Sequence, residues 1–421
     1  MRNIFVLFSL AIVFISCSLH EPKPIKANEK AFAEEDLYIL YALRAEEVKE
    51  YGAASELFTK LYTKSHKREY LYRSLENDLV AKKDEKLIKR VDALQKDKPF
   101  DVKLLRYKVI ALFELNKLDE AKKFGVILAT QTKETNDYLL VSDIYIKRQE
   151  YDLAVKYLES AYVKENDEKI LDKLSIILYV NLNRKKEAIA HLETHSRMLG
   201  CSRRICSRLI AFYANDNNIE GLLSTYLRLY EVNKDPKITK KIIQIYAYKQ
   251  DYPALTKFLE KSGADDEVLL QLYSSAKNYT KAYPLADTLY KETAKIDFLG
   301  QSAIYEYEGA KDKSSKEVLQ SVIQKLEKVV QEKHQDIYLN YLGYILIDHE
   351  IDIKKGMAYV DKVLESQPHS AFYLDSKAWG YYKLGQCKKA DKLIRKVSKM
   401  QGGDNPEIIL HIQEINKCLK K

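Results

Sequence analysis

A small residue followed by larger apolar residues recurs along this chain with a period close to 34 residues. Six successive intervals, from Ala54 to Ala254, are 33 or 34 residues long, and the later ones are 28, 36, 38 and 34. Such a period is typical of arrays in which each repeat buries its apolar face only against its neighbours. The anchors are Ala54, Leu87, Ala121, Ala154, Ala188, Gly221, Ala254, Ala282, Val318, Gly356 and Ala390.

Each repeat has the periodicity of two helices. In residues 138–161, apolar side chains recur at spacings of three and four on both sides of Lys147, Arg148 and Gln149. A small residue at the anchor lets two helices approach closely. The chain has only 13 Gly and 8 Pro, where average usage would give roughly 29 and 21. This scarcity of turn formers excludes β-sandwiches, barrels and large α/β enzymes.

The pattern resembles the tetratricopeptide repeat (TPR), most clearly near the carboxyl end. The stretch 374–380 also resembles a run found in TPR lipoproteins of the bacterial envelope. The resemblance implies an all-α fold, a right-handed superhelical solenoid of about eleven TPR-like helix hairpins with a C-terminal capping helix after Pro406. Two repeats, 336–370 and 371–404, carry the signature residues Leu342, Gly343, Gly356, Pro368, Ala378, Tyr381, Gly385 and Ala390.

The amino-terminal residues have the layout of an export signal. Arg2 precedes a 12-residue apolar run, Ile4–Ile15, which is shorter than the ~20 residues of a membrane span. Residues 14–17 resemble the bacterial lipobox, which implies cleavage before Cys17 and lipidation of that cysteine, palmitate included. Ordinary signal cleavage with an incidental cysteine is the alternative. Ser18 after the cysteine resembles an outer-membrane sorting pattern.

Together these patterns predict a lipoprotein of the cell envelope, anchored in the outer membrane and facing the periplasm. Inner-membrane anchoring stays open. The predicted segments are a signal peptide at 1–16, a flexible tether with lipidated Cys17 at 17–34, divergent TPR-like repeats at 35–335, and two well-matched repeats with the capping helix at 336–421.

Four of the 5 cysteines remain once Cys17 accepts the lipid, an even number in an oxidising compartment. Cys201 and Cys206 flank a place where a loop is expected to bend into a helix. Cys387 and Cys418 are expected at ends of antiparallel helices that meet. We therefore predict disulfides 201–206 and 387–418.

A zinc site is the alternative for part of this set. His191 and His195 are one helical turn apart, and with Cys201 and Cys206 they could complete a tetrahedron. The predicted oxidising compartment favours the disulfide, so no metal site is expected. The sequence offers no Ser-His-Asp arrangement, no Gly-rich phosphate loop and no CxxC pair. We therefore expect no enzymatic activity and no cofactor.

The resemblance also implies a partner-binding groove. In TPR proteins, fixed positions of the first helix commonly face the concave surface, where aromatic and hydrogen-bonding groups can hold a peptide or helix. The alternative is that Trp379 packs between repeats and Asp375 pairs locally. Transferred to the last two repeats, the groove positions are Asn340, Tyr344, Asp348, Phe372, Asp375, Trp379, Tyr382 and Lys383.

The net charge of +9 arises from 70 basic and 61 acidic residues and is therefore a small imbalance. Nucleic acid is excluded as a partner by the predicted compartment, and a glycan has no specific support. The leading hypothesis is a non-enzymatic scaffold that binds other envelope proteins, with the flagellar motor as one candidate assembly. The alternative is a lipoprotein regulator or adaptor of envelope synthesis, in peptidoglycan synthase activation or polysaccharide export.

Overall fold

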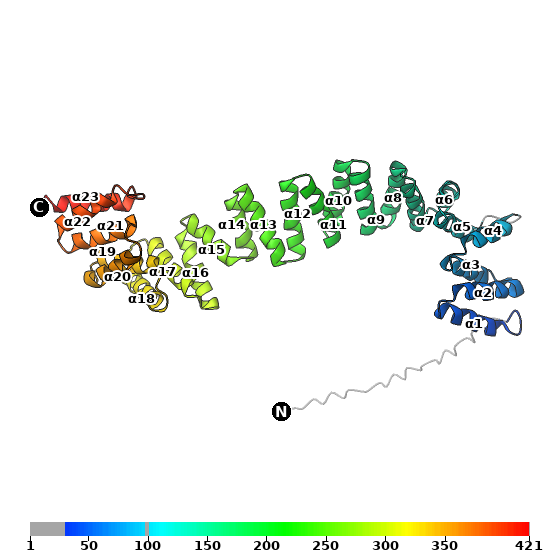
Figure 1. Ribbon diagram of the computed structural model, residues 1–421, viewed down its shortest axis with the longest axis horizontal. Helices are drawn as coiled ribbons and strands as arrows, with labels where there is room; N and C mark the ends of the chain where they lie inside the picture. Colours follow the sequence, from blue (N-terminus) through cyan, green and yellow to red (C-terminus); the bar gives the residue numbers. More distant parts are fainter. Residues whose placement is uncertain (1–29, 97–100, 421) are drawn as a thin grey trace, which may run out of the picture. The chain divides into compact units, whose positions relative to one another are not determined.

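The computed structural model describes residues 30–96 and 101–420. Within these ranges the chain forms α-helices numbered α1 to α23 and one π-helical turn, with no strand (Figure 1). In the described part of the chain, every helix is too short or too polar to cross a membrane. The predicted signal peptide, Cys17 and residues 18–29 of the predicted tether lie outside the described residues.

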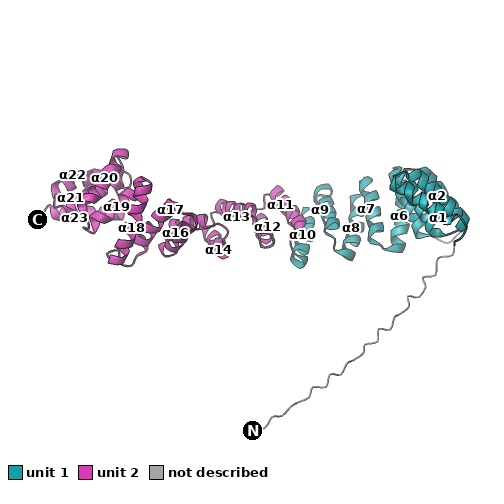
Figure 2. Cartoon of the chain, turned by 90° about the horizontal axis from the view of Figure 1, so that it is seen from below, with its two compact units in different colours: residues 1–200 teal, residues 201–421 magenta. Residues whose placement is uncertain are grey.

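The chain divides into two compact units, residues 1–200 and 201–421 (Figure 2). The first unit contains five helix hairpins, the last of which has the π-helical turn in its first arm. Its helices are α1 (Glu35–Glu47), α2 (Tyr51–Ser65), α3 (Arg68–Val80), α4 (Asp84–Gln95), α5 (Val102–Glu114), α6 (Leu118–Thr132), α7 (Thr135–Lys147), α8 (Tyr151–Glu165), α9 (Glu168–Ile176), η1 (Ile177–Asn181) and α10 (Lys185–Leu199).

The second unit contains six hairpins and a final single helix. Its helices are α11 (Arg203–Asn215), α12 (Ile219–Val232), α13 (Pro236–Lys249), α14 (Tyr252–Ser262), α15 (Asp266–Ser275), α16 (Tyr279–Thr293), α17 (Ile296–Gly309), α18 (Lys316–Glu332), α19 (Asp336–Asp348), α20 (Ile353–Ser366), α21 (Ala371–Lys383), α22 (Cys387–Val397) and α23 (Pro406–Cys418).

This arrangement confirms the predicted fold class, an all-α array of eleven TPR-like hairpins with a carboxyl-terminal capping helix. The right-handed superhelix stays a prediction. The predicted boundary between residues 335 and 336 also stays a prediction. It separates divergent repeats from repeats that match the TPR signature well, and it does not describe two compact units.

The anchor residues lie where two helices of a hairpin touch. Each of them falls in the second helix of its hairpin. Ala54 and Ala121 are fully buried. At the α19–α20 crossing, a Cβ atom added to Gly356 would lie 2.6 Å from the carbonyl oxygen of Gly343. The helices therefore meet backbone to backbone, which explains why the anchor must be small.

The turns inside the hairpins explain the scarcity of glycine. Ten hairpins have one residue in the left-handed region between their two helices, and only Gly385 among these ten residues is a glycine. Polar side chains occupy the other positions and tolerate this conformation at some energetic cost. They are Lys49, Lys82, Asn116, Gln149, Asn183, Asn217, Gln250, Lys277 and Glu350.

Exchanging residues at two of these turns should change stability in opposite directions. Gly385 has a φ of 73° and open space around it, so Gly385→Ala should destabilise the protein by about 1 kcal/mol through backbone strain alone. Gln149 has a φ of 62°, and Gln149→Gly should be stabilising by a few tenths of a kcal/mol. Urea unfolding followed by circular dichroism measures both. A loss of stability in both variants would contradict the strain argument.

Candidate functional site

The first helices of the last hairpins form a surface that carries a pocket of about 340 Å³. Three of these helices (α17, α19 and α21) line it together with the amino-terminal end of α23, so the pocket spans four alternate helices of the second unit. We call it the first-helix pocket. Its lining residues are Glu308, Ile337, Asn340, Tyr341, Tyr344, Phe372, Tyr373, Asp375, Ser376, Asn405, Glu407 and Ile408.

One wall of the pocket is rich in hydrogen-bond acceptors. The side-chain oxygen of Asn340 is buried and has no hydrogen-bond partner among the described residues. The Tyr341 hydroxyl donates to Glu308 Oε1 at 3.2 Å, and Lys313 Nζ donates to Glu308 Oε2 at 2.7 Å. Burial, reinforced by the Glu308 carboxylate, raises the pKa of Tyr341. This phenol therefore stays protonated at neutral pH.

The same pocket also joins an aromatic ring to an acidic rim. Burial, and then the carboxylates of Glu407 and Asp348, raise the pKa of Tyr344. Glu407 lies exposed in the first turn of α23, and Phe372 is 51% exposed. Aromatic faces and acceptor oxygens together are the surroundings that favour a cationic group carrying N–H donors.

The structure separates the predicted groove residues into two sets. Asn340, Tyr344, Phe372 and Asp375 line the first-helix pocket. The remaining four do not line it, although α19 and α21 are in contact. They are Asp348, Trp379, Tyr382 and Lys383.

These four residues form a closed cluster instead of an open surface. Trp379 Nε1 donates to Asp348 Oδ1 at 2.8 Å, and Lys383 Nζ donates to the Asp348 carbonyl oxygen at 2.7 Å. The Trp379 indole stacks on the Tyr382 ring, with 4.6 Å between centroids. The Trp379 indole N–H and the Lys383 ammonium thus find acceptors on Asp348 inside the chain.

The capping helix covers this cluster. The His411 ring of α23 stacks on Trp379 with centroids 4.0 Å apart, and His411 Nδ1 lies 2.9 Å from Asp375 Oδ2. Trp379 and Asp375 are only 7% and 5% exposed. The interpretation of Trp379 as an open partner-binding residue therefore needs correction, because α23 occupies the position of the next repeat's first helix.

Sequence reasoning missed three residues that shape the pocket. Tyr341 follows the predicted Asn340 directly, and Glu308 comes from the preceding hairpin, to which the groove positions were not extended. Glu407 belongs to the capping helix, to which the TPR groove positions do not strictly apply. Applying the groove positions also to α17 and to the capping helix could have identified Glu308 and Glu407.

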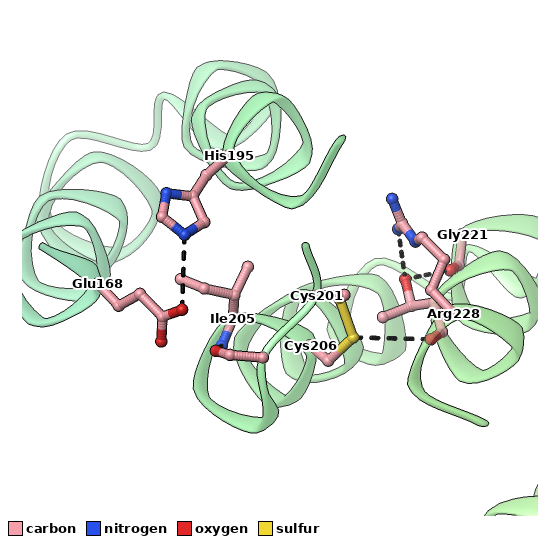
Figure 3. Close-up of a disulfide and its surroundings, with 9 residues drawn as sticks. Glu168, His195, Cys201, Ile205, Cys206, Gly221 and Arg228 are labelled. Carbon is pink, nitrogen blue, oxygen red and sulfur yellow. Dashed lines mark hydrogen bonds and ion pairs between the residues drawn. A yellow bond between two sulfur atoms is a disulfide. The ribbon is translucent and has the colours of Figure 1, made fainter. Parts of the chain in front are cut away.

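The structure joins Cys201 to Cys206 in the second unit, with Cα atoms 5.4 Å apart (Figure 3). Cys201 precedes α11 in non-helical backbone, so the two side chains can converge although they are five positions apart. The Cys206 sulfur is fully buried and lies 3.8 Å from the Thr225 carbonyl oxygen of α12. The bridge thus ties the start of α11 to its hairpin core.

The second bridge joins Cys387 to Cys418, with Cα atoms 5.8 Å apart. Cys387 is the first residue of α22 and Cys418 the last residue of α23. The bond therefore holds the free end of the cap against the last hairpin.

The alternative zinc site is not assembled. The sulfurs of Cys201 and Cys206 bond to each other and so cannot act as thiolate ligands. His195 instead lies 2.7 Å from the Tyr162 hydroxyl, through Nδ1, and 3.6 Å from Glu168 (Figure 3). His191 does approach two carboxylates, Glu159 and Glu187, but the Arg184 guanidinium already pairs with Glu187.

The helices and the pocket define this chain as an all-α helical-repeat protein with an acceptor-lined pocket across successive first helices. No protein-family model matches the sequence, and no curated protein matches it either.

Among solved structures, the chain is similar to three whose sequence identity to it is 10–14%. A chain of the Naa15/Naa10 complex bound to HypK-THB matches 83% of this chain and 67% of its own, with a TM-score of 0.36. A chain of the APC/C hetero-tetramer Cut9–Hcn1 covers 93% of this chain and 85% of its own length, with a TM-score of 0.34. A tetratricopeptide repeat protein from Parabacteroides merdae covers 67% of this chain and 98% of its own length, with a TM-score of 0.30. The chain's own helices define its fold.

Proposed function

We propose that this protein is a non-enzymatic, membrane-anchored scaffold that binds other proteins of an envelope assembly from the periplasm. The observation that carries the proposal is the first-helix pocket. Its unpaired Asn340 oxygen, its acidic Glu407 rim and its exposed Phe372 ring together offer a binding site for a basic side chain of a partner. Binding needs no chemical step, and the polar groups of the pocket are arranged as acceptors rather than as a nucleophile with a base.

The tether is the second part of the proposal. The lipobox-like residues 14–17 support cleavage before Cys17, and several acyl chains on one residue suffice for stable anchoring. Ser18 supports an outer-membrane location. An anchor would restrict the helical repeats to a layer near the membrane and raise the local concentration of partners held there.

The flagellar motor is one candidate assembly, proposed only by analogy with bacteria that build motor scaffolds from TPR proteins. Regulation of envelope synthesis is the alternative within the same mechanism, since the pocket could equally hold a segment of a peptidoglycan synthase or an export protein.

Photocrosslinking in intact cells tests the scaffold and its compartment together. A photoreactive residue in place of the half-exposed Ile337 at the pocket rim should capture an envelope protein through a segment that contains Lys or Arg. Cys17→Ala should abolish acyl labelling and release the protein from the membrane fraction. Capture of cytoplasmic proteins alone would overturn the proposed compartment. Unchanged membrane fractionation of Cys17→Ala would overturn the anchor.

The charge of the rim should control this binding. Glu407→Lys places a cation where the pocket needs an acid, so capture from Ile337 should fall by about tenfold or more. Glu332→Lys makes the same charge change on an exposed residue of the second helix α18 and serves as the control. Equal yields from both variants would show that Glu407 takes no part in recognition.

A further inference from the structure

A second pocket, of about 510 Å³, lies on the side of the last hairpins where the second helices α20 and α22 meet α21. None of its lining residues belongs to the first-helix pocket. We call it the second-helix pocket. It is lined by Leu364, Pro368, Leu374, Lys377, Tyr381, Lys389, Lys392, Leu393 and Lys396.

The floor of the second-helix pocket is apolar. Leu374 is buried, and Leu364, Tyr381 and Leu393 are half-buried against the same core cluster. Pro368, in the turn between α20 and α21, also lines the pocket. A recess with such a floor can take up one large apolar side chain.

The rim of this pocket is strongly basic. Lys389, Lys392 and Lys396 are three and four residues apart on α22, so they share one face of the helix. All three are exposed, and none makes an ion pair within the described part of the chain. Residues 387–400 hold six basic side chains against a single acid, Asp391, which Arg395 already pairs.

Other lysines of the second unit, unlike these three, do make ion pairs. Lys281, for example, reaches Glu260 at 2.7 Å, and Lys355 reaches Glu327 at 2.7 Å. Like charges one helical turn apart destabilise a helix, so the unpaired lysines of α22 lower the stability of the free protein. A partner that supplies carboxylates would relieve this repulsion.

We propose that the second-helix pocket binds an acidic segment of a partner protein, which inserts one large apolar side chain between α20 and α22 and sets carboxylates against Lys389, Lys392 and Lys396. Charge complementarity selects the acidic partner. The recessed floor selects a protein segment over an anionic membrane, because a flat lipid surface would meet the lysines without reaching the leucines. This goes beyond the proposed function: with the first-helix pocket it gives the protein two sites of opposite charge.

A labelled helical peptide is a suitable probe, with glutamates one turn apart around a central phenylalanine. Fluorescence anisotropy with the full-length protein in detergent should show binding that weakens with salt. The triple variant Lys389→Glu, Lys392→Glu, Lys396→Glu should lose about tenfold or more in affinity. The control carries the same charge change at three exposed lysines of α13 that likewise make no described ion pair: Lys237, Lys240 and Lys241. It should bind as the wild type does.

The peptide itself provides a test that does not depend on folding of a variant. Replacing its phenylalanine with alanine should cost about tenfold or more, because the apolar floor is then left unfilled. Equal binding by both peptides, or by both triple variants, would overturn the proposal. So would a wild-type protein that ignores the peptide but binds vesicles of equal parts phosphatidylglycerol and phosphatidylcholine through the same lysines, since the site would then be a membrane contact.

Discussion

Replacing both Cys387 and Cys418 with serine is expected to cost the carboxyl-terminal end of the second unit about 3–4 kcal/mol of stability. The bridge closes a loop with a sequence separation of 31 residues, which includes nearly all of α22 and α23. Without it, the unfolded chain regains the entropy that the closed loop excludes. Because α23 is the last element and packs mainly against α21 and α22, the loss should appear first as release of the cap.

Trp379 makes this release measurable. It is the only tryptophan of the chain, and its indole lies between the rings of Tyr382 and His411. Urea titration followed by tryptophan emission should therefore show an earlier transition to a solvent-exposed spectrum in the double variant. Dithiothreitol should have the same effect on the wild type.

The matched control for this experiment is the other disulfide. Cys201 and Cys206 are five positions apart, so their serine variant should lose only about 2 kcal/mol through the same entropy term. Its effect on the Trp379 signal should be small, because the bridge lies at the start of α11 and not in the last hairpin or the cap. If the two serine variants shifted the Trp379 transition equally, the disulfide at 387–418 would not be a clamp on α23.

The fold could be predicted from the sequence because its rule is local and repeated. A small anchor, a polar turn and larger residues one and two helical turns later recur often enough that weak single matches reinforce one another. Leu87 and Val318 are poor anchors taken alone, yet both lie in second helices as the period requires. The turns were harder to recognise, since nine of them place a residue other than glycine in the left-handed region.

The candidate site could be predicted only in part, because it depends on contacts between repeats. Four of the predicted groove positions, Asn340, Tyr344, Phe372 and Asp375, lie in one pocket. They assume, however, that the face of the last repeat is open, and here α23 closes it over Trp379. The pairing of His411 with Asp375 joins residues 36 positions apart and leaves no periodic trace in the sequence.

The second-helix pocket, too, could not be predicted from the sequence alone. The basic run 387–400 is visible in the sequence, but a charge run is usually a solvated helix face. Only the structure shows that Lys389, Lys392 and Lys396 border an apolar recess lined by residues of α20, α21 and α22.

Replacing Asp375 with alanine should destabilise the docked cap by about 3 kcal/mol, since it removes the only described hydrogen-bond partner of a buried histidine. His411 is 1% exposed, so water cannot reach the ring nitrogen while α23 stays in place. Asp375→Asn keeps an acceptor oxygen and should cost only about 1 kcal/mol. Trp379 emission during urea unfolding measures both variants.

The exposed pair Asp361–Lys377 provides the matched control for this prediction. Its atoms are 2.7 Å apart, but the Asp361 side chain is 50% exposed, so Asp361→Ala should be close to neutral. If burial is what makes the Asp375–His411 contact important, stability should fall in the order Asp361→Ala, Asp375→Asn, Asp375→Ala. A neutral Asp375→Ala, or a costly Asp361→Ala, would show that the cap is held by its apolar contacts and disulfide alone. Because α23 also supplies Glu407 to the first-helix pocket, undocking the cap should weaken partner capture from Ile337 in that same order.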